Sequence, residues 1–238
     1  MRVLAIDSSG LTATVAIVED DTTIAEFTIN YKKTHSQTLL PMLDEIVKMT
    51  ELDLKTIDAI AVAKGPGSFT GLRIGSATAK GLGLALDKPL VGIPTVEALA
   101  YNLYDVNGLI CPIMDARRKQ VYTGIYRYED HRLMTVKDQM AVGIEELLSM
   151  LNEMGEAVTF LGDGVPVFKD IIVDKLTVPF SFAPAHLSRQ RAGAVGALGI
   201  LYYKEETAAE HKPDYLRVSQ AERERAQKMK KGSEGENA

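Results

Sequence analysis

The chain has 238 residues, of which 46% are hydrophobic and 25% charged, and its formal net charge is -5 at pH 7. These values are typical of a globular protein with room for two small domains, and the acidic balance argues against unaided binding of nucleic acid. The single cysteine, Cys111, stands in an apolar run, which excludes an internal disulfide and favours a buried, inert thiol. No apolar run approaches the ~20 residues of a membrane span. We therefore expect a cytoplasmic protein that does not contact membranes.

A buried strand over residues 3–7 opens the chain and ends in Asp7, and a second strand over 12–18 follows a short polar turn. Further along, Asp115 follows the apolar run 110–114 in the same way. The recurrence predicts two related lobes that face each other across a cleft, where ligands usually bind. Each Asp has a simpler alternative role as a turn former that accepts backbone N–H bonds.

An amphipathic helix is predicted over about residues 36–50. Its apolar positions cover roughly half of the helix wheel, whereas a helix lying on a sheet needs a stripe of only somewhat more than ~100°. These positions are Leu39, Leu40, Met42, Leu43, Ile46, Val47 and Met49. The extra width indicates a second apolar contact, either with another helix of the same lobe or with a partner protein.

The glycine-rich stretch 65–71 lies between an apolar strand over 57–63 and a helix over 70–86, with Thr70 expected to cap that helix. Such a loop before a helix suggests phosphate binding. The named phosphate-binding motifs nevertheless fail, because a Walker loop needs Lys-Ser or Lys-Thr after its last glycine and Leu72 stands there instead. We therefore favour a tight turn with close helix packing.

Small residues recur at intervals of four along the helix over 70–86, at Gly71, Gly75, Ala79 and Gly83. Residues spaced by four lie on one helix face, so this face is smooth and another backbone could approach it closely. Together with the broad apolar helix that precedes it, this helix could form a four-helix interface with a matching pair.

The second half of the chain predicts a helix over 143–154, a strand over 157–161 and a close-packed helix over 187–203. The expected organisation is an N-terminal lobe over 1–106 and a smaller C-terminal lobe over 107–218. Charged and small residues then dominate 219–238, which we expect to be a disordered tail.

Four motifs together resemble the TsaB (YeaZ) family. They are Asp7-Ser8-Ser9, Thr34-His35-Ser36 with Leu39-Leu40-Pro41, the segment Gly65-Pro66-Gly67-Ser68-Phe69-Thr70-Gly71-Leu72-Arg73-Ile74-Gly75, and Pro213-Asp214-Tyr215-Leu216-Arg217. The resemblance covers residues 1–218. It implies the α/β, two-lobed fold of actin, sugar kinases and Hsp70 (the ASKHA fold), in which each lobe is a mixed sheet with packed helices. It also implies a role in forming threonylcarbamoyladenosine beside the anticodon of tRNAs that read codons beginning with A (ANN).

The resemblance further implies that the protein is not itself an enzyme. It would be the partner of the catalytic paralogue TsaD, which transfers the threonylcarbamoyl group, and the ATPase TsaE would join them. The expected partner interface comprises Ser36, Leu39, Leu40, Leu43, Val47, Leu72, Gly75, Ser76, Ala79 and Gly83. Without the partner, the same face is expected to form a homodimer. On this view Leu40→Asp or Ala79→Arg would abolish pairing without unfolding the lobe.

The sequence departs from the catalytic members of this fold. The paralogue holds a metal with a His-x-x-x-His pair, whereas here Leu39 stands four positions after His35, so no metal is expected. The kinase signature Asp-x-Gly-x-Thr has Ser9 and Leu11 at its glycine and threonine positions. A possible remnant of nucleotide binding comprises Asp7, Ser8, Ser9, Gly67 and Ser68. We expect no tightly bound cofactor, with ATP or ADP held only at the junction with partners.

Two other classes stay open on the residues. A small-molecule kinase or ATPase is supported by Asp7, Asp115 and the expected cleft, and opposed by the missing phosphate glycine. A metallopeptidase is opposed by the isolated His35. tRNA is expected to reach the chain only through the complex. Basic residues of the tail could touch RNA, although a solvated charged end is the favoured interpretation: Arg223, Arg225, Lys228, Lys230 and Lys231.

Overall fold

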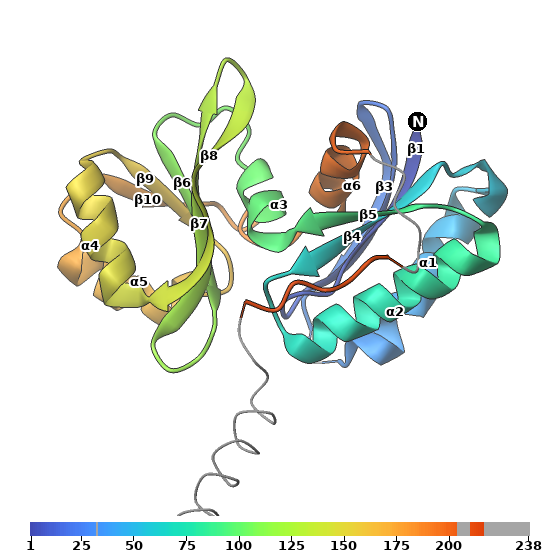
Figure 1. Cartoon of the computed structure of the whole chain (residues 1–238), viewed down its shortest axis with the longest axis horizontal. Coiled ribbons are helices and arrows are strands. Elements are labelled where there is room, and N and C mark those ends of the chain that lie inside the picture. Colours follow the sequence, from blue (N-terminus) through green and yellow to red (C-terminus); the bar gives the residue numbers. More distant parts are fainter. Residues whose placement is uncertain (32, 204–209, 217–238) are drawn as a thin grey trace, which may run out of the picture.

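The computed structural model describes residues 1–31, 33–203 and 210–216, and it shows two α/β lobes side by side (Figure 1). Each lobe contains a five-stranded mixed sheet, with strand orders β3-β2-β1-β4-β5 and β10-β9-β6-β7-β8. In both sheets the first three strands in sequence are antiparallel and the last two run parallel to the first. The predicted duplication is therefore confirmed at the level of topology. The charged tail predicted over 219–238 lies outside the described residues.

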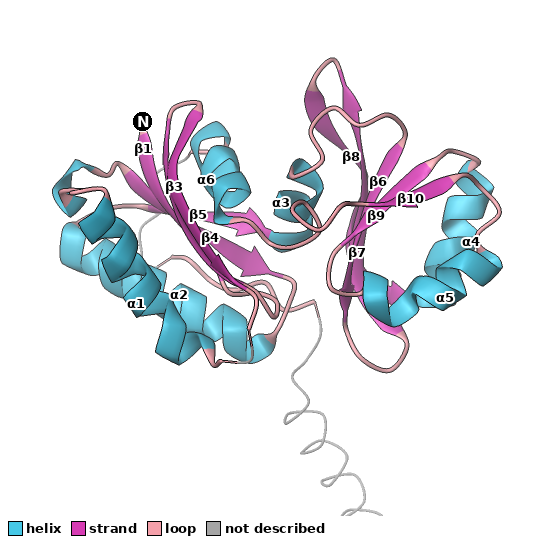
Figure 2. Ribbon diagram, turned by 180° about the vertical axis from the view of Figure 1, so that it is seen from behind, coloured by secondary structure: helices cyan, strands magenta, loops and turns pink. Residues whose placement is uncertain are grey.

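The first lobe is a sheet covered by helices on both faces (Figure 2). Its strands are β1 (Arg2–Asp7), β2 (Ala13–Glu19), β3 (Thr22–Ile29), β4 (Ala59–Gly65) and β5 (Leu90–Pro94). Helices α1 (His35–Met49) and α2 (Phe69–Leu86) cover one face, α6 (Ala192–Leu201) covers the other, and a 3-10 turn, η1 (Leu54–Thr56), precedes β4. Because strand side chains alternate between faces, Leu4 and Ile6 pack under α1 and α2 while Val3 and Ala5 pack under α6.

Helix α6 corrects the predicted lobe boundary. The sequence placed it in the second lobe, over 187–203, but the structure begins it at Ala192 and packs it on the first lobe's sheet. Its glycines allow this close approach, since a Cβ at Gly196 would lie 2.5 Å from a methyl of Val18, and one at Gly199 would lie 2.6 Å from the Ala61 Cβ. The chain therefore crosses into the second lobe and returns.

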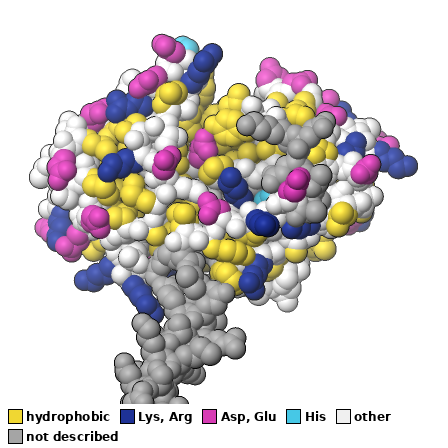
Figure 3. Space-filling view, viewed as in Figure 1, with side chains coloured by type: hydrophobic (Ala, Val, Ile, Leu, Met, Phe, Trp, Pro, Cys, Tyr) yellow, Lys and Arg dark blue, Asp and Glu magenta, His cyan; other side chains and the backbone are white. Residues whose placement is uncertain are grey.

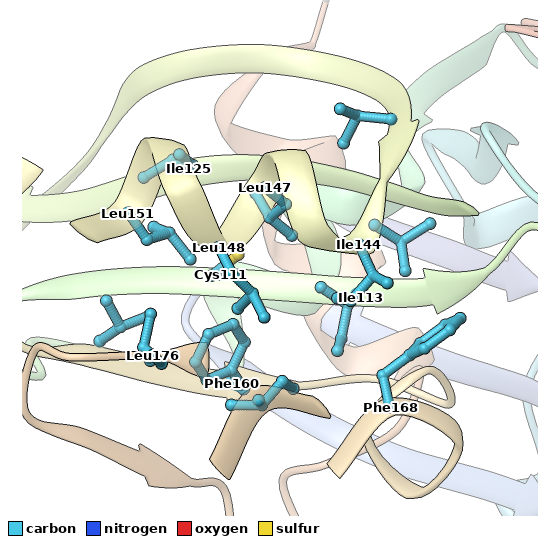
Figure 4. Packing of buried hydrophobic residues seen from close by; sticks show 14 of the residues in the cluster. Cys111, Ile113, Ile125, Ile144, Leu147, Leu148, Leu151, Phe160, Phe168 and Leu176 are labelled. Atoms are coloured by element: carbon cyan, nitrogen blue, oxygen red, sulfur yellow. The ribbon is translucent and has the colours of Figure 1, made fainter. Parts of the chain in front are cut away.

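The second lobe is centred on β6 (Leu109–Asp115), between β7 (Gln120–Glu129) and β9 (Val158–Leu161), with β8 (Arg132–Gly143) and β10 (Phe180–Phe182) at its edges. Helices α4 (Ile144–Met154) and α5 (Val165–Lys175) belong to its main core. Leucines of α4 point toward Cys111 and Phe160 in this core (Figure 4). The prediction of a buried thiol at Cys111 is confirmed, and burial raises the pKa of this thiol to about 12.

Helix α3 (Thr95–Tyr101) lies between the lobes and packs against Ile110 and Met114 of the second sheet. A polar contact joins it to the returning chain, because the Asn102 side-chain amide donates to the carbonyls of Leu187 and Arg189, at 3.2 and 2.8 Å. This helix and the returning segment therefore connect the two lobes. None of the described helices is long and apolar enough to cross a membrane.

Residues 210–216, called the strap below, run along α2 toward the second lobe (Figure 1, red). Near its start, a ring nitrogen of His211 lies 3.2 Å from the Ser76 hydroxyl on α2. Further along, the Asp214 amide donates to the Lys64 carbonyl at 2.6 Å, and the Asp214 carboxylate accepts from the Gln139 side chain on β8 at 2.6 Å. The strap thus contacts both lobes at a place separate from α3.

We predict that Asp214→Ala widens the distribution of angles between the lobes, because it removes the hydrogen bond to Gln139 and leaves that amide without its acceptor. Donor and acceptor dyes on the two lobes should report a broader distance distribution by single-molecule fluorescence. Lys212→Ala, at an exposed neighbouring position, is the matched control. Identical distributions for the variant and the control would show that the strap does not hold the lobes.

Candidate functional site

A cavity of about 1030 Å³ lies between the lobes, so the predicted cleft is confirmed. The first lobe contributes the β1–β2 turn, the segment before α1 and the start of α2. The second lobe contributes the ends of β6 and β9, and the strap contributes its last residues. Its polar and aromatic lining includes Ser9, Tyr31, Lys33, His35, Ser68, Phe69, Asp115, Arg117, Tyr122, Asp163, Asp214 and Tyr215.

Asp7 ends β1 beneath this cleft and is 1% exposed. Its Oδ1 accepts the amide of Ser9 at 2.8 Å, which is the turn-forming role that the sequence left open. Asp115 occupies the equivalent position in the second lobe and accepts the amide of Arg117, also at 2.8 Å. Burial raises the pKa of Asp7 to about 6, although its contacts with Ser9 and the nearby His35 partly oppose this shift.

The β1–β2 turn is locked to the glycine-rich loop. The Ser8 hydroxyl donates to the Gly71 carbonyl at 2.9 Å, and the Ser68 amide donates to the Ser9 carbonyl at 2.7 Å. A Cβ at Gly67 would lie 2.3 Å from the Ser9 carbonyl oxygen, and one at Gly71 would lie 2.0 Å from that of Ser8. Only glycine permits this approach, so the loop glycines serve close packing.

The same contacts occupy groups that would otherwise face a phosphate. The amides of Ser9, Ser68 and Gly71 donate to Asp7 Oδ1, the Ser9 carbonyl and the Ser68 hydroxyl, respectively. The hydroxyl that caps α2 therefore belongs to Ser68 and not to Thr70, because the helix begins one residue earlier than predicted. The predicted remnant residues are thus brought together, and their described bonds are to one another and to neighbouring backbone.

The contacts between the β1–β2 turn and the glycine-rich loop, through Ser8, Ser9, Ser68 and Gly71, are called the interlock below. His35 also takes part in it. Its Nε2 lies 2.9 Å from the Gly10 carbonyl oxygen, and a Cβ at Gly71 would lie 3.4 Å from its ring. Across the cleft, Asp163 Oδ1 accepts the amide of Asp115 at 3.2 Å, and burial raises the pKa of the Asp163 carboxyl. Among the described residues, no group of three His, Cys, Asp or Glu side chains is placed to hold a metal ion.

The structure divides the predicted partner interface in two. Seven of its ten residues are buried within the lobe, where their side chains cannot reach a partner: Leu39, Leu43, Leu72, Gly75, Ser76, Ala79 and Gly83. The physical reason is that the smooth face of α2 packs on its own sheet and on the β1–β2 turn; a Cβ at Gly75 would lie 2.5 Å from the Ser8 hydroxyl oxygen. Burial argues against direct contacts from these seven side chains, whereas Ser36, Leu40 and Val47 lie at or near the surface. The partner interface itself stays a prediction.

The open face of α2 carries small residues that sequence reasoning did not single out. Ala77, Gly81 and Ala85 are exposed at intervals of four, and a Cβ at Gly81 would meet nothing within 4 Å. Leu84 is 73% exposed beside them, and Leu40 on α1 is 56% exposed. The spacing of 77, 81 and 85 was a usable signal, because it repeats that of 71, 75, 79 and 83 on the adjacent face.

Comparison with known proteins places these features in a family. The family described as "TsaD: tRNA N6-adenosine threonylcarbamoyltransferase" matches residues 22–225. The Bacillus subtilis "tRNA threonylcarbamoyladenosine biosynthesis protein TsaB" is 39% identical over 225 residues, covering 93% of this chain and 96% of the relative. The chain belongs to the TsaB (YeaZ) family. The predicted family resemblance is thereby confirmed.

Solved structures agree on the fold. The structure of YeaZ from Pseudomonas aeruginosa matches with a TM-score of 0.75 at 22% identity, covering 90% of this chain and 99% of that one. A polyphosphate/ATP-glucomannokinase from an Arthrobacter strain matches with a TM-score of 0.51 at 13% identity. The match covers 82% of this chain and 96% of the kinase. The predicted ASKHA fold is confirmed for this TsaB-family chain.

We predict that Asp7 makes the TsaB-family fold less stable as pH rises from about 4 to about 6. Because its pKa is raised, Asp7 keeps a proton in the folded state that it has already released in the unfolded chain. Each unit by which the pH rises in this window therefore lowers the free energy of unfolding. Asp7→Asn retains an acceptor for the Ser9 amide and removes the charge. The substitution should raise the free energy of unfolding at neutral pH by about 3 kcal/mol, since each pKa unit corresponds to about 1.4 kcal/mol. It should also make the free energy of unfolding less dependent on pH in this window. Urea denaturation across the window tests this, and parallel curves for the two proteins would contradict it.

We predict opposite results for arginine at two nearby positions of α2. Ala79→Arg should destabilise the lobe by more than ~3 kcal/mol, because a charged side chain would replace a methyl group that is 0% exposed. This replaces the expectation that the variant would stay folded. Gly81→Arg should leave the melting temperature unchanged or higher, since the position is open and arginine favours helix. Thermal unfolding of both variants checks the assignment of the two faces.

Proposed function

We propose that this TsaB-family protein is a non-catalytic subunit in the biosynthesis of threonylcarbamoyladenosine in tRNA. It pairs with a TsaD-type transferase, which carries the threonylcarbamoyl group to the adenosine next to the anticodon of ANN-reading tRNAs, and a TsaE-type ATPase joins the pair. The proposal places this work in the cytoplasm. Any ATP or ADP would be held at the junction with the partners, and no cofactor would be bound tightly by the chain alone.

The observation that carries the proposal is the exposed surface of α1 and α2. Leu40 and Leu84 present large apolar side chains to solvent, and Ala77 and Gly81 leave room for another helix to approach. Exposed apolar side chains beside small residues suit close contact with another helix. We define this surface by Leu40, Val47, Ala77, Gly81 and Leu84 and call it the helical face.

A non-catalytic role is supported by the bonding at the interlock. The amides of Ser9, Ser68 and Gly71 donate within the chain, and His35 contacts the Gly10 carbonyl. A phosphate could be cradled by the amides of Ser9, Ser68 and Gly71 only if their present bonds were broken. This favours a structural use of the motif over ATP hydrolysis by the chain alone.

Self-association follows from the same surface. When no partner covers the helical face, two copies of the chain can pair through it about a two-fold axis, because such an interface is formed by the same surface of both subunits. We propose that the chain forms a homodimer when the transferase is absent, and that the two assemblies compete for the helical face. Adding the transferase should therefore convert the dimer into the mixed pair.

We predict that Leu40→Asp and Gly81→Arg abolish pairing with the TsaD-type transferase while the chain stays folded. Each introduces a charge or bulk at the exposed helical face. Gel filtration coupled to light scattering measures the pairing, and circular dichroism verifies the fold. Ser149→Asp, exposed on α4 in the other lobe, is the control.

The same variants enter a modification assay with the transferase, the ATPase, tRNA, ATP and threonylcarbamoyl-adenylate. Modified adenosine should require this chain and should be lost with Leu40→Asp. Wild-type pairing by both helical-face variants would overturn the interface. Full modification without the chain would overturn the accessory role and direct attention to the cleft between the lobes.

A further inference from the structure

The turn between β6 and β7 has an unusual backbone. Arg117, Arg118 and Lys119 follow one another in the left-handed region, with φ values of 64°, 57° and 58°. This region is unfavourable for residues with a Cβ, and Asn, Asp and His tolerate it best. The other hairpin turns follow that rule, since their left-handed positions hold Asp20, Asp130 and His131. Three long basic side chains in this conformation point to a use for the side chains themselves.

The surrounding structure holds the turn in place. The Ala116 amide donates to the Gln120 carbonyl at 3.0 Å, and the Lys119 carbonyl accepts the amide of Ile144 at 3.0 Å. With the backbone held from both sides, residues 117–119 project into solvent. We call them the basic turn.

Acidic neighbours balance part of this charge. Arg117 pairs with Asp115 at 3.1 Å. Lys119 lies near Glu145, whose carboxylate also pairs with Lys175 at 2.9 Å. Arg118 has no ion-pair partner within residues 1–31, 33–203 and 210–216. The basic turn therefore retains positive charge available to an anion.

Aromatic rings and further cations lie across the same cleft. Arg117, Lys33, Tyr31, Phe69 and Tyr215 all line the cavity, and Tyr31 is 70% exposed. The Phe69 and Tyr215 ring centroids are 4.7 Å apart, and the Arg73 guanidinium lies 4.0 Å from the Phe69 centroid. Lys and Arg side chains are visible along the lower edge of the molecule in Figure 3. In single-stranded nucleic acid binding, aromatic rings stack on the bases while nearby cations bind the phosphate backbone.

We propose that the basic turn and the facing aromatic rings contact RNA within the assembled complex. The turn binds backbone phosphates, and the rings at the cleft mouth accept an unstacked base. Carboxylates of Asp163 and Asp214 line the cleft and repel phosphates from its interior, so the phosphates stay at the turn. An acidic protein partner would use the cations but would leave the exposed rings without a role, which favours RNA. This inference rests on the proposed function, which brings tRNA to the complex.

The test uses Arg118→Asn combined with Lys119→Asn, because asparagine tolerates the left-handed backbone and carries no charge. Fluorescence anisotropy measures the affinity of the complex of this chain with its transferase for an unmodified tRNA transcript. We expect Kd to rise at least tenfold at low salt. The slope of log K against log salt should become shallower by between about 1 and 2, as lost phosphate contacts require. The melting temperature should stay equal or rise.

Arg132→Gln is the matched control, since Arg132 is exposed at the opposite end of the β7–β8 hairpin. It should leave affinity and salt slope unchanged. Equal tRNA affinity in the double variant and the wild type would overturn the inference. Loss of transferase pairing by the double variant, with its fold intact, would also overturn it, because the turn would then bind protein.

The two proposals fail separately. If the wild-type chain does not pair with the transferase, the proposed function fails, and the same titration is then made with the wild-type and variant chains alone. An affinity that still falls with the double variant supports the RNA contact. No detectable binding by either chain, or equal binding by both, overturns it.

Discussion

The interlock between the β1–β2 turn and the start of α2 is the contact on which the first lobe depends. Two carbonyl oxygens, of Ser8 and Ser9, occupy space that a Cβ at Gly71 or Gly67 would need. Backbone is therefore packed directly on backbone, and hydrogen bonds from Ser8 and Ser68 hold the two segments together. This arrangement sets the position of α2 on the sheet, of the cleft floor above Asp7, and of the helix face left to solvent. The glycine-rich motif is accounted for by packing, with no phosphate in the argument.

The sequence predicted an element correctly where its residue pattern is typical of only one kind of secondary structure. Apolar runs that end in Asp7 and Asp115 predicted buried strands with a turn after each, and the two sheets share that arrangement. Elements with mixed or short patterns were missed. Every residue of β3 is exposed or half-buried, so the strand lacks a clear alternation, and α3 has only seven residues.

The predicted partner interface shows a different limit. A helix face made of small residues predicts that something approaches closely, but it does not say whether the neighbour belongs to the same chain. On α2 the face through Gly75 and Ala79 meets its own sheet, and the face through Ala77 and Gly81 is open. Likewise, α6 is rich in glycine and alanine all round, and only the fold reveals that it returns to the first lobe. Burial resolves these cases because it depends on contacts distant in sequence.

The strap connects surfaces that would otherwise be independent. Ser76 is buried on the inner side of α2, and its contact with His211 anchors a segment whose Asp214 reaches Gln139 on the second lobe. Burial lowers the pKa of His211 to about 4, with Lys80 and Lys64 acting in the same direction, so the ring is neutral and the contact does not change near neutral pH. The strap therefore joins α2 and β4 of the first lobe to β8 of the second lobe through hydrogen bonds that do not depend on a charged histidine.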